Sequence, residues 1–381
     1  MGTKTNRRRN RTMIFGVFGL TMLALLAAWP VGVAEAGQPG TVTWHGYGEL
    51  HYNDPKGSSV PGKDDPAQMD FHRMVWGMSY SWDERISLHA EVDFEHAAKE
   101  IELEFAYLDF LIRPEFNLRA GVVLMPVGPL NEFHEPPRFF SVERPYLQRT
   151  VIPTTWQEGG VGLFGTLGED FNYRAYLVSG LDSKGFTAKD GIRKGRTNGG
   201  DAPNEKFAWV GRLEYIGVPG LSLGTSVYHG GANQDPTSDV DIDVTLLEGD
   251  IKYTRSGLDF QAMYAQIDID NPDKIVGQTV GEKIAGWNVE LAYHLSALDP
   301  DTQQDLVPFV RWESFNTQEA TPAAAYAADP ANDRKVFTVG LAYYPIPDVV
   351  VKADLETWED ADNNDTGEEK RRFNLGLGYQ F

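Results

Sequence analysis

The chain ends in a segment with two different faces. In the last eleven residues, apolar and aromatic side chains alternate strictly with polar or small ones. The apolar set is Phe373, Leu375, Leu377, Tyr379 and Phe381. A period of two places the two sets on opposite faces of a β-strand. The segment therefore predicts a strand with one face toward an apolar medium and the other toward water. An edge strand of a soluble sandwich has the same pattern, so this segment alone leaves both folds open.

The other end has the layout of a secretory signal peptide. Basic residues crowd the first eleven positions, an apolar run extends from Met13 to Trp29, and Ala34-Glu35-Ala36 has the small-x-small pattern of a cleavage site. The run is about as long as a short membrane-spanning helix, so a retained anchor is the alternative. Because the cleavage pattern follows it directly, removal is favoured. We predict a signal peptide over residues 1–36 and one exported domain over residues 37–381.

Composition excludes several classes of function. The net charge is −21, and residues 1–36 carry five basic residues and one acidic residue, so the mature chain has −21 − 4 = −25. Such an acidic chain is unsuited to nucleic acid, whose phosphates need a basic surface. There are no cysteines, which excludes disulfides, thiolate metal sites and cysteine nucleophiles. Sequence signatures of zinc proteases and phosphate-binding loops are also absent. We therefore expect no enzyme, no cofactor and no metal.

The mature chain contains a series of alternating runs, each about ten residues long, which is the length of a tilted membrane-crossing strand. Sixteen such strands are predicted: 41–53, 68–80, 85–95, 101–112, 116–125, 156–166, 170–180, 205–216, 220–230, 242–254, 257–269, 283–295, 306–316, 334–344, 348–358 and 371–381. No remaining apolar run is long enough for a spanning helix.

The connections between these strands alternate in length. Short ones such as 113–115 follow every second strand, and long ones such as 126–155 lie between them. The connections 96–100 and 296–305 fit this rule less well. Short periplasmic turns and long outer loops are typical of outer-membrane barrels, and an even strand number places both termini on the periplasmic side. We predict an all-β fold, a transmembrane antiparallel β-barrel of sixteen strands in the bacterial outer membrane.

One face of the predicted strands carries charge. A charged side chain near the lipid midplane costs about 2–4 kcal/mol, so this face must line the lumen. The predicted wall residues are Arg85, Glu91, Asp93, Arg119, Arg311 and Glu313.

The longest connection, 126–155, is rich in proline and aromatic residues rather than in glycine and serine. Its aromatic side chains need a surface to pack against, and a long structured loop in a compact domain is usually functional. We predict that it folds into the lumen and constricts it. Its candidate constriction residues are Arg138, Arg144, Arg149, His134, Glu132, Glu135 and Glu143.

This loop carries a resemblance to a known family. It reads Pro-x-Gly-x-x-Asn-x-x-His-Glu-Pro-Pro from Pro126, followed by Arg-Pro and Ile-Pro-Thr-Thr-Trp-x-Glu-x-Gly. The pattern resembles bacterial outer-membrane porins of the phosphate-selective O and P group. The resemblance implies a trimeric diffusion channel for small hydrophilic solutes or ions, anions such as phosphate among them. The lipid, the lipopolysaccharide and the barrel-insertion machinery would be its other partners, and Phe381 with Tyr379 looks like the insertion signal. Three glutamates beside the arginines leave phosphate selectivity open.

Two alternatives also stay open. The 181–204 connection is basic and could attract anions, although a solvated surface loop is favoured. The barrel could also be non-conducting and serve as an adhesin, a scaffold or a sleeve for a partner protein.

Overall fold

The computed structural model describes residues 39–56, 66–202, 204–299, 301–360 and 370–381. The predicted signal peptide, residues 1–36, lies outside the described part. The strands are β1 (Val42–Lys56), β2 (Gln68–Ser81), β3 (Ile86–Glu95), β4 (Glu100–Arg113), β5 (Phe116–Leu124), β6 (Gln157–Leu167), β7 (Phe171–Ser179), β8 (Phe207–Val218), β9 (Leu221–Gly231), β10 (Asp243–Arg255), β11 (Leu258–Ile269), β12 (Lys283–Tyr293), β13 (Asp305–Ala320), β14 (Asp333–Ile346), β15 (Val349–Asp360) and β16 (Lys370–Gln380).

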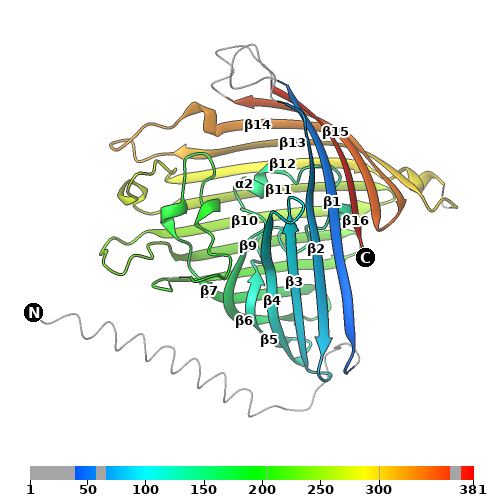
Figure 1. The fold of residues 1–381 in the computed structure, drawn as a ribbon, viewed down its shortest axis with the longest axis horizontal. Coiled ribbons are helices and arrows are strands. Elements are labelled where there is room, and N and C mark those ends of the chain that lie inside the picture. Colours follow the sequence, from blue (N-terminus) through cyan, green and yellow to red (C-terminus); the bar gives the residue numbers. More distant parts are fainter. Residues whose placement is uncertain (1–38, 57–65, 203, 300, 361–369) are drawn as a thin grey trace, which may run out of the picture.

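The sixteen strands form one closed antiparallel barrel in which each strand pairs with its sequence neighbours and β1 pairs with β16. The predicted number is confirmed, and the predicted bounds differ from the observed ones by at most four residues. Figure 1 shows the near wall, β1 to β5, crossing the far wall, β8 to β14, at a steep angle, as expected from strands that tilt against the barrel axis. The terminal residue completes the closure, because Phe381 exchanges two backbone hydrogen bonds of 2.9 and 3.0 Å with Gly46.

The two faces of the strands separate as the alternation predicts. In β13, Val310 and Trp312 are 40% and 56% exposed on the outside, whereas Arg311 and Glu313 are 1% and 0% exposed inside. The outer face is apolar along most of the barrel, so its medium is the lipid bilayer. The inner face holds the charges. Three aromatic residues near strand ends, Tyr228, Tyr344 and Trp358, contact residues inside the barrel.

Helical segments are short and lie in the connections. They are η1 (Pro136–Arg138), α2 (Tyr146–Thr150), η2 (Ser183–Gly185), η3 (Arg193–Gly195), η4 (Pro272–Lys274), η5 (Leu295–Leu298) and η6 (Pro330–Asn332). In the part of the chain that is described, none of these is a helix that could cross a membrane. The connection after β12, which is long for its end of the barrel, is organised by η5 and by a 2.5 Å contact between His294 and Asp305.

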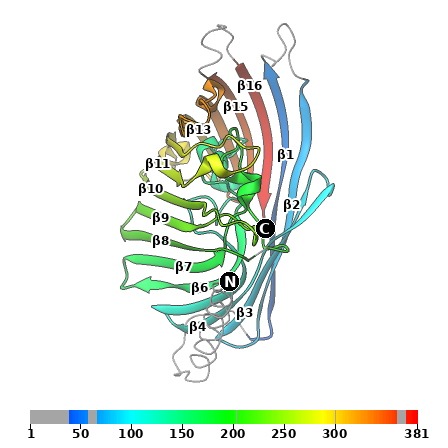
Figure 2. The same cartoon turned by 90° about the vertical axis from the view of Figure 1, so that its left-hand side faces the viewer.

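The hydrophobic core of the protein lies inside the barrel. Two connections turn inward: residues 126–155, called here the lumen loop, and residues 180–206, called the mouth loop. Leu147 and Ile152 of the lumen loop and Phe186 and Ile192 of the mouth loop are fully buried, and they pack with inward-facing wall residues such as Ile284. Figure 2 shows these loops and α2 enclosed by the strands. The predicted inward fold of the third long loop is confirmed.

Candidate functional site

The lumen loop is fixed to the far wall through the first turn of α2. The Glu313 carboxylate on β13 accepts hydrogen bonds from the backbone amides of Tyr146 at 3.1 Å and Leu147 at 2.9 Å. The Tyr146 hydroxyl donates to Glu356 on β15 at 3.0 Å. The first amides of a helix have no partner within the helix, so the carboxylate supplies their missing acceptor. Its negative charge also interacts favourably with the positive end of the helix dipole. Glu313 therefore anchors the loop rather than facing free lumen.

The same loop also touches the near wall. The His134 ring contacts Glu104 on β4 at 2.5 Å and the Tyr47 hydroxyl on β1 at 2.9 Å. Farther along, the Val142 amide donates to Asp354 on β15 at 2.6 Å. Because its contacts lie on strands spread around the barrel, the loop crosses the lumen instead of lining one side.

Glycines on β16 make room for this crossing. A Cβ atom at Gly378 would lie 2.4 Å from the Cβ of Pro136, and one at Gly376 would lie 3.1 Å from the side chain of Val142. A contact of 2.4 Å is not tolerated between real side chains, so only glycine fits at Gly378. Gly376 and Gly378, which alternate with apolar residues at the end of the sequence, therefore form the surface on which the lumen loop packs.

The three glutamates of the loop are held by neighbours. Glu132 pairs with Arg174 on β7 at 3.1 Å, and Glu135 contacts Arg138 at 3.7 Å. Glu143 accepts from Asn53 at 3.2 Å and lies 3.6 Å from His51, both on β1. Burial alone would raise the pKa of Glu143, but the hydrogen bond and charge of His51, with Arg372 and Arg149, lower it well below its usual range. Glu143 is therefore a firmly ionised and compensated carboxylate.

The three arginines of the loop are less compensated. Among the residues that the structure describes, Arg144 has no hydrogen-bond or ion-pair partner, and its Nη1 atom is buried. Burial and the positive charge of Arg73 lower the pKa of Arg144 to about 10, so it stays charged at neutral pH. Arg138 and Arg149 have side chains that are 55% and 48% exposed, and their ion pairs are long, at 3.7 and 3.4 Å. The loop thus presents positive charge to the remaining space.

Two cavities flank the lumen loop. One of about 430 Å³ is lined by Arg138, Phe140, Lys252, Asp259 and His294, among others. The second, of about 410 Å³, lies against β1 and β3 to β7 and is lined by the other part of the loop, from Glu132 to Glu135, and by wall residues including Arg119 and Arg174. Both are lined by charged as well as aromatic side chains and are large enough for small hydrated solutes.

The predicted wall residues lie in compact ion-pair groups. Arg311 contacts Glu313 at 2.8 Å and Glu290 at 3.0 Å. Arg119 contacts Asp109 at 2.8 Å and stacks 3.9 Å above the Tyr107 ring. Asp93 pairs with Arg73 at 3.3 Å, and Glu91 pairs with His45 at 2.8 Å.

Arg85 has a different position. It precedes β3 in the β2–β3 turn, is partly exposed, and bonds Asp83 through both its amide, at 2.8 Å, and its guanidinium, at 3.4 Å. It belongs to the rim of the barrel rather than to the wall around the lumen loop.

The mouth loop differs from the favoured expectation of a solvated surface loop. Its Arg193 donates to the carbonyls of Arg149, at 2.8 Å, and of Thr154, and its Arg196 donates to those of Pro153, at 3.0 Å, and Thr155. Its backbone carbonyls at Ala188 and Lys189 in turn accept hydrogen bonds from the far wall, from Thr317 and Arg334. The apolar residues between its charges explain the inward fold. Its arginines therefore hold the lumen loop in place.

Sequence reasoning missed several lumen residues. Lys352 donates to the Ser141 carbonyl at 2.9 Å, and Arg212 pairs with Asp250 at 2.7 Å and Glu248 at 3.3 Å. Each lies on the polar face of an alternating strand, so the signal was present. The partners could not be assigned because they come from strands and loops far away in sequence.

Comparison with known proteins places the chain in a family and the fold in a class. No family model matches the sequence. The chain is 32% identical over 343 residues to an uncharacterized protein of Aquifex aeolicus (strain VF5), covering 84% of this chain and 77% of that protein.

Similar solved structures are outer-membrane proteins, among them a porin and a channel. They include an anion-selective porin from Comamonas acidovorans, with a TM-score of 0.60 and 10% identity over 90% of this chain and 100% of that one. The trimer form of OmpT of Vibrio cholerae has a TM-score of 0.59 and 11% identity over 90% of this chain and 100% of that one. The outer-membrane channel DcaP of Acinetobacter baumannii has a TM-score of 0.59 and 11% identity over 92% of this chain and 100% of that one. At these identities the likeness concerns the fold. The chain belongs to the same family as the Aquifex aeolicus protein, and it has the sixteen-stranded fold of outer-membrane porins.

Proposed function

We propose that the protein is an outer-membrane porin through which small hydrophilic solutes and ions diffuse down their gradients. The observation that carries the proposal is the lumen loop, which crosses a sixteen-stranded barrel and leaves cavities of about 410 and 430 Å³, with charged side chains in their walls, beside it. Barrels of this size enclose an aqueous channel unless something fills them. A loop held by wall residues on several strands sets the width of such a channel, and charges on it set the selectivity.

The charges of the loop favour anions at this constriction. Glu132 and Glu143 are compensated by wall residues, whereas Arg144 has no hydrogen bond among the described residues and Arg138 and Arg149 are half-exposed. The electric field of a half-exposed arginine attracts anions of any kind, from chloride to phosphate. This agrees with the resemblance to the phosphate-selective group, and with the likeness to a porin described as anion-selective. A preference for phosphate over other anions is the narrower form of this proposal.

Assembly and targeting complete the proposal. A homotrimer fits the likeness to an outer-membrane protein described in trimer form. Export would use residues 1–36, and Phe381 with Tyr379 would be read by the barrel-insertion machinery. Phe381 is 60% exposed at the end of the closing strand, where a receptor can reach it before β1 and β16 pair. Lipid and lipopolysaccharide would surround the apolar outer face.

The test is single-channel conductance of the folded mature protein in planar bilayers under a KCl gradient. Stable conductance steps with a reversal potential on the anion side are expected. Arg138→Glu combined with Arg149→Glu changes the local charge by four units while replacing side chains that are half-exposed. One charge acts on an ion about 8 Å away in water with about 0.5 kcal/mol. Screening reduces this, so a several-fold shift of the permeability ratio toward cations is expected.

The matched control is Arg113→Glu, an exposed arginine at the end of β4, next to the β4–β5 turn. It should leave the reversal potential unchanged. Equal shifts in both variants would contradict the assigned role of the loop. Absence of conductance from a correctly folded barrel would favour the alternative, a non-conducting barrel that acts as an adhesin, a scaffold or a sleeve.

A further inference from the structure

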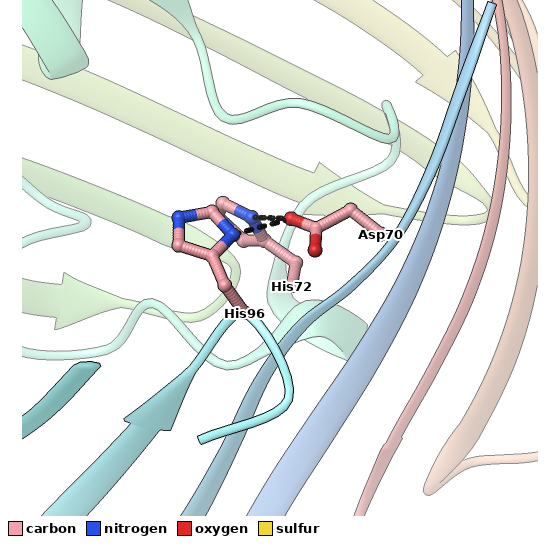
Figure 3. Close-up of side chains that lie close together, drawn as sticks. All are labelled: Asp70, His72 and His96. Carbon is pink, nitrogen blue, oxygen red and sulfur yellow. Dashed lines mark hydrogen bonds and ion pairs between the residues drawn. The ribbon is translucent and has the colours of Figure 1, made fainter. Parts of the chain in front are cut away.

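Two histidines and an aspartate meet at the end of the barrel that carries the long connections. Asp70 and His72 lie on β2, and His96 is the first residue after β3. The Nδ1 atom of His96 lies 2.7 Å from Oδ2 of Asp70, and the Nδ1 atom of His72 lies 3.3 Å from the same oxygen. Figure 3 shows both rings directed at this carboxylate. One ligand atom from each residue lies within 4.8 Å of the other two.

The first local cause of this convergence is a β-bulge. Along β1 and β2, Glu49 is opposite Arg73 but Leu50 is opposite Phe71, so His72 is an extra residue on β2. A bulge changes the direction of the side chains around it and is a common device for placing functional groups. Because of the bulge, Asp70 and His72 no longer follow the strict in-and-out alternation of the strand.

The second cause is the turn after β3. His96, Ala97 and Ala98 have φ angles of 50°, 58° and 66°, which place three consecutive non-glycine residues in the left-handed region. This conformation is unfavourable for side chains of the L configuration. Backbone hydrogen bonds hold the turn to the bulge, from the His96 amide to the His72 carbonyl at 2.9 Å and from the Ala97 amide to the Phe71 carbonyl at 3.1 Å. The turn therefore holds the His96 ring beside His72.

We propose that Asp70, His72 and His96 bind a divalent transition-metal ion of the zinc class. Two imidazole nitrogens and one carboxylate oxygen are a donor set that suits Zn²⁺, Cu²⁺ or Ni²⁺, whereas Mg²⁺ and Ca²⁺ prefer oxygen ligands alone. All three side chains are partly exposed, so an ion can enter from solvent and keep water in its remaining position. Ligation replaces protons now shared between the rings and the carboxylate, so binding releases protons.

A third histidine, His51, supports the site without joining it. The His51 ring stacks on His72 with centroids 4.7 Å apart and planes 13° apart. Its two nitrogens are engaged elsewhere, with Glu49 at 3.1 Å and Glu143 at 3.6 Å. His51 thus fixes the orientation of the His72 ring, as partners of metal ligands commonly do. It also links the site to Glu143 of the lumen loop, so an ion bound here would lie at the entrance of the lumen.

The experiment is calorimetric titration of the folded mature protein, in detergent, with Zn²⁺. One ion per chain is expected. His72→Gln, Asp70→Asn and His96→Asn should each weaken binding by about tenfold or more, since even changes to partners of ligands cost about 10–100-fold. Asparagine is chosen at His96 because it tolerates positive φ. X-ray absorption of the zinc complex should show two nitrogen ligands at about 2.0–2.1 Å.

The matched control is His89→Gln, which removes a histidine of the lumen wall that bonds Ser79 at 2.9 Å and Ser87 at 3.0 Å. It should bind Zn²⁺ as the unmodified protein does. No binding to the unmodified protein, or equal affinity in all the variants, would overturn the proposal, provided that circular dichroism shows the same β content. Binding is measured on the folded barrel and does not depend on whether the barrel conducts.

Discussion

The two loops inside the barrel use the same residue type in opposite ways. The mouth loop directs Arg193 and Arg196 at backbone carbonyls of the lumen loop, so their charge is consumed by hydrogen bonds. The lumen loop leaves Arg144 without a partner among the described residues and exposes half of Arg138 and Arg149. An arginine that is hydrogen-bonded to backbone carbonyls has a structural role. An arginine that faces the open lumen instead exerts its field on the solutes that diffuse through it. Amino-acid composition cannot distinguish these two roles, because both loops contain arginines.

The largest effect is expected at the anchor of the lumen loop. Glu313→Ala removes the acceptor for two α2 amides and a partner of buried Arg311. Breaking a buried pair of this kind costs about 3–5 kcal/mol. The lumen loop should detach from β13, conductance should rise and fluctuate, and trypsin should cut after Arg149, whereas the Arg144–Pro145 bond resists trypsin. Glu84→Ala, at an exposed turn residue, should behave as the unmodified protein. A protected loop in the Glu313 variant would contradict the anchoring role.

A smaller effect is expected where the loops meet. Arg196→Gln removes charged hydrogen bonds to Pro153 and Thr155, each worth about 1.5–3 kcal/mol. The segment 149–155 should loosen, which proteolysis and hydrogen exchange would detect, while the ion selectivity should change little. The control is Lys194→Gln, an exposed neighbour paired with Asp190. If Arg196→Gln shifted the reversal potential as strongly as the Arg138 and Arg149 variant, the distinction between the two loops would fail.

A milder effect is expected where the lumen loop packs on the glycines of β16. Gly378→Ala places a Cβ atom 2.4 Å from Pro136, and overpacking of this kind costs about 1–3 kcal/mol. The loop should shift, giving a modest change in conductance with the barrel intact. Gly249→Ala is the control, because its nearest neighbour atom would be 4.0 Å away. Equal conductance in the two variants would count against close packing on β16.

The smallest effect concerns pH. The pKa of Glu143 is lowered well below its usual range, although burial opposes this, because His51 and nearby arginines favour the charged form. Its contribution to loop stability is therefore complete above the ordinary carboxyl range, near pH 4.5, and is lost as the pH falls through the lowered pKa. Conductance between pH 8 and pH 5 should show no transition from this group. A transition in that window that disappears in Glu143→Gln would contradict the assignment.

Much of the barrel could be predicted because its cause is local. Each strand needs one face for lipid and one for water, and this demand is written as alternation within about ten residues. Val310, Arg311, Trp312 and Glu313 were placed on the correct faces by this argument. Tyr228, Tyr344 and Trp358 are aromatic residues on the inner face, where the lumen loop and its neighbours contact them. A loop that fills the lumen gives the inner face an apolar partner, which alternation alone does not reveal.

The sites depend on contacts between distant segments. The unpaired state of Arg144, the role of Arg196 and the meeting of Asp70 and His72 with His96 are set by strand register, by the bulge at His72 and by the turn after β3. A shift of one residue in pairing would change each of them. Sequence by itself determined the barrel, its strand number and the loop destined for the lumen. Only the tertiary structure decided which charges are compensated, because a charge is neutralised by whichever residue lies within a few ångströms of it, wherever that residue occurs along the chain.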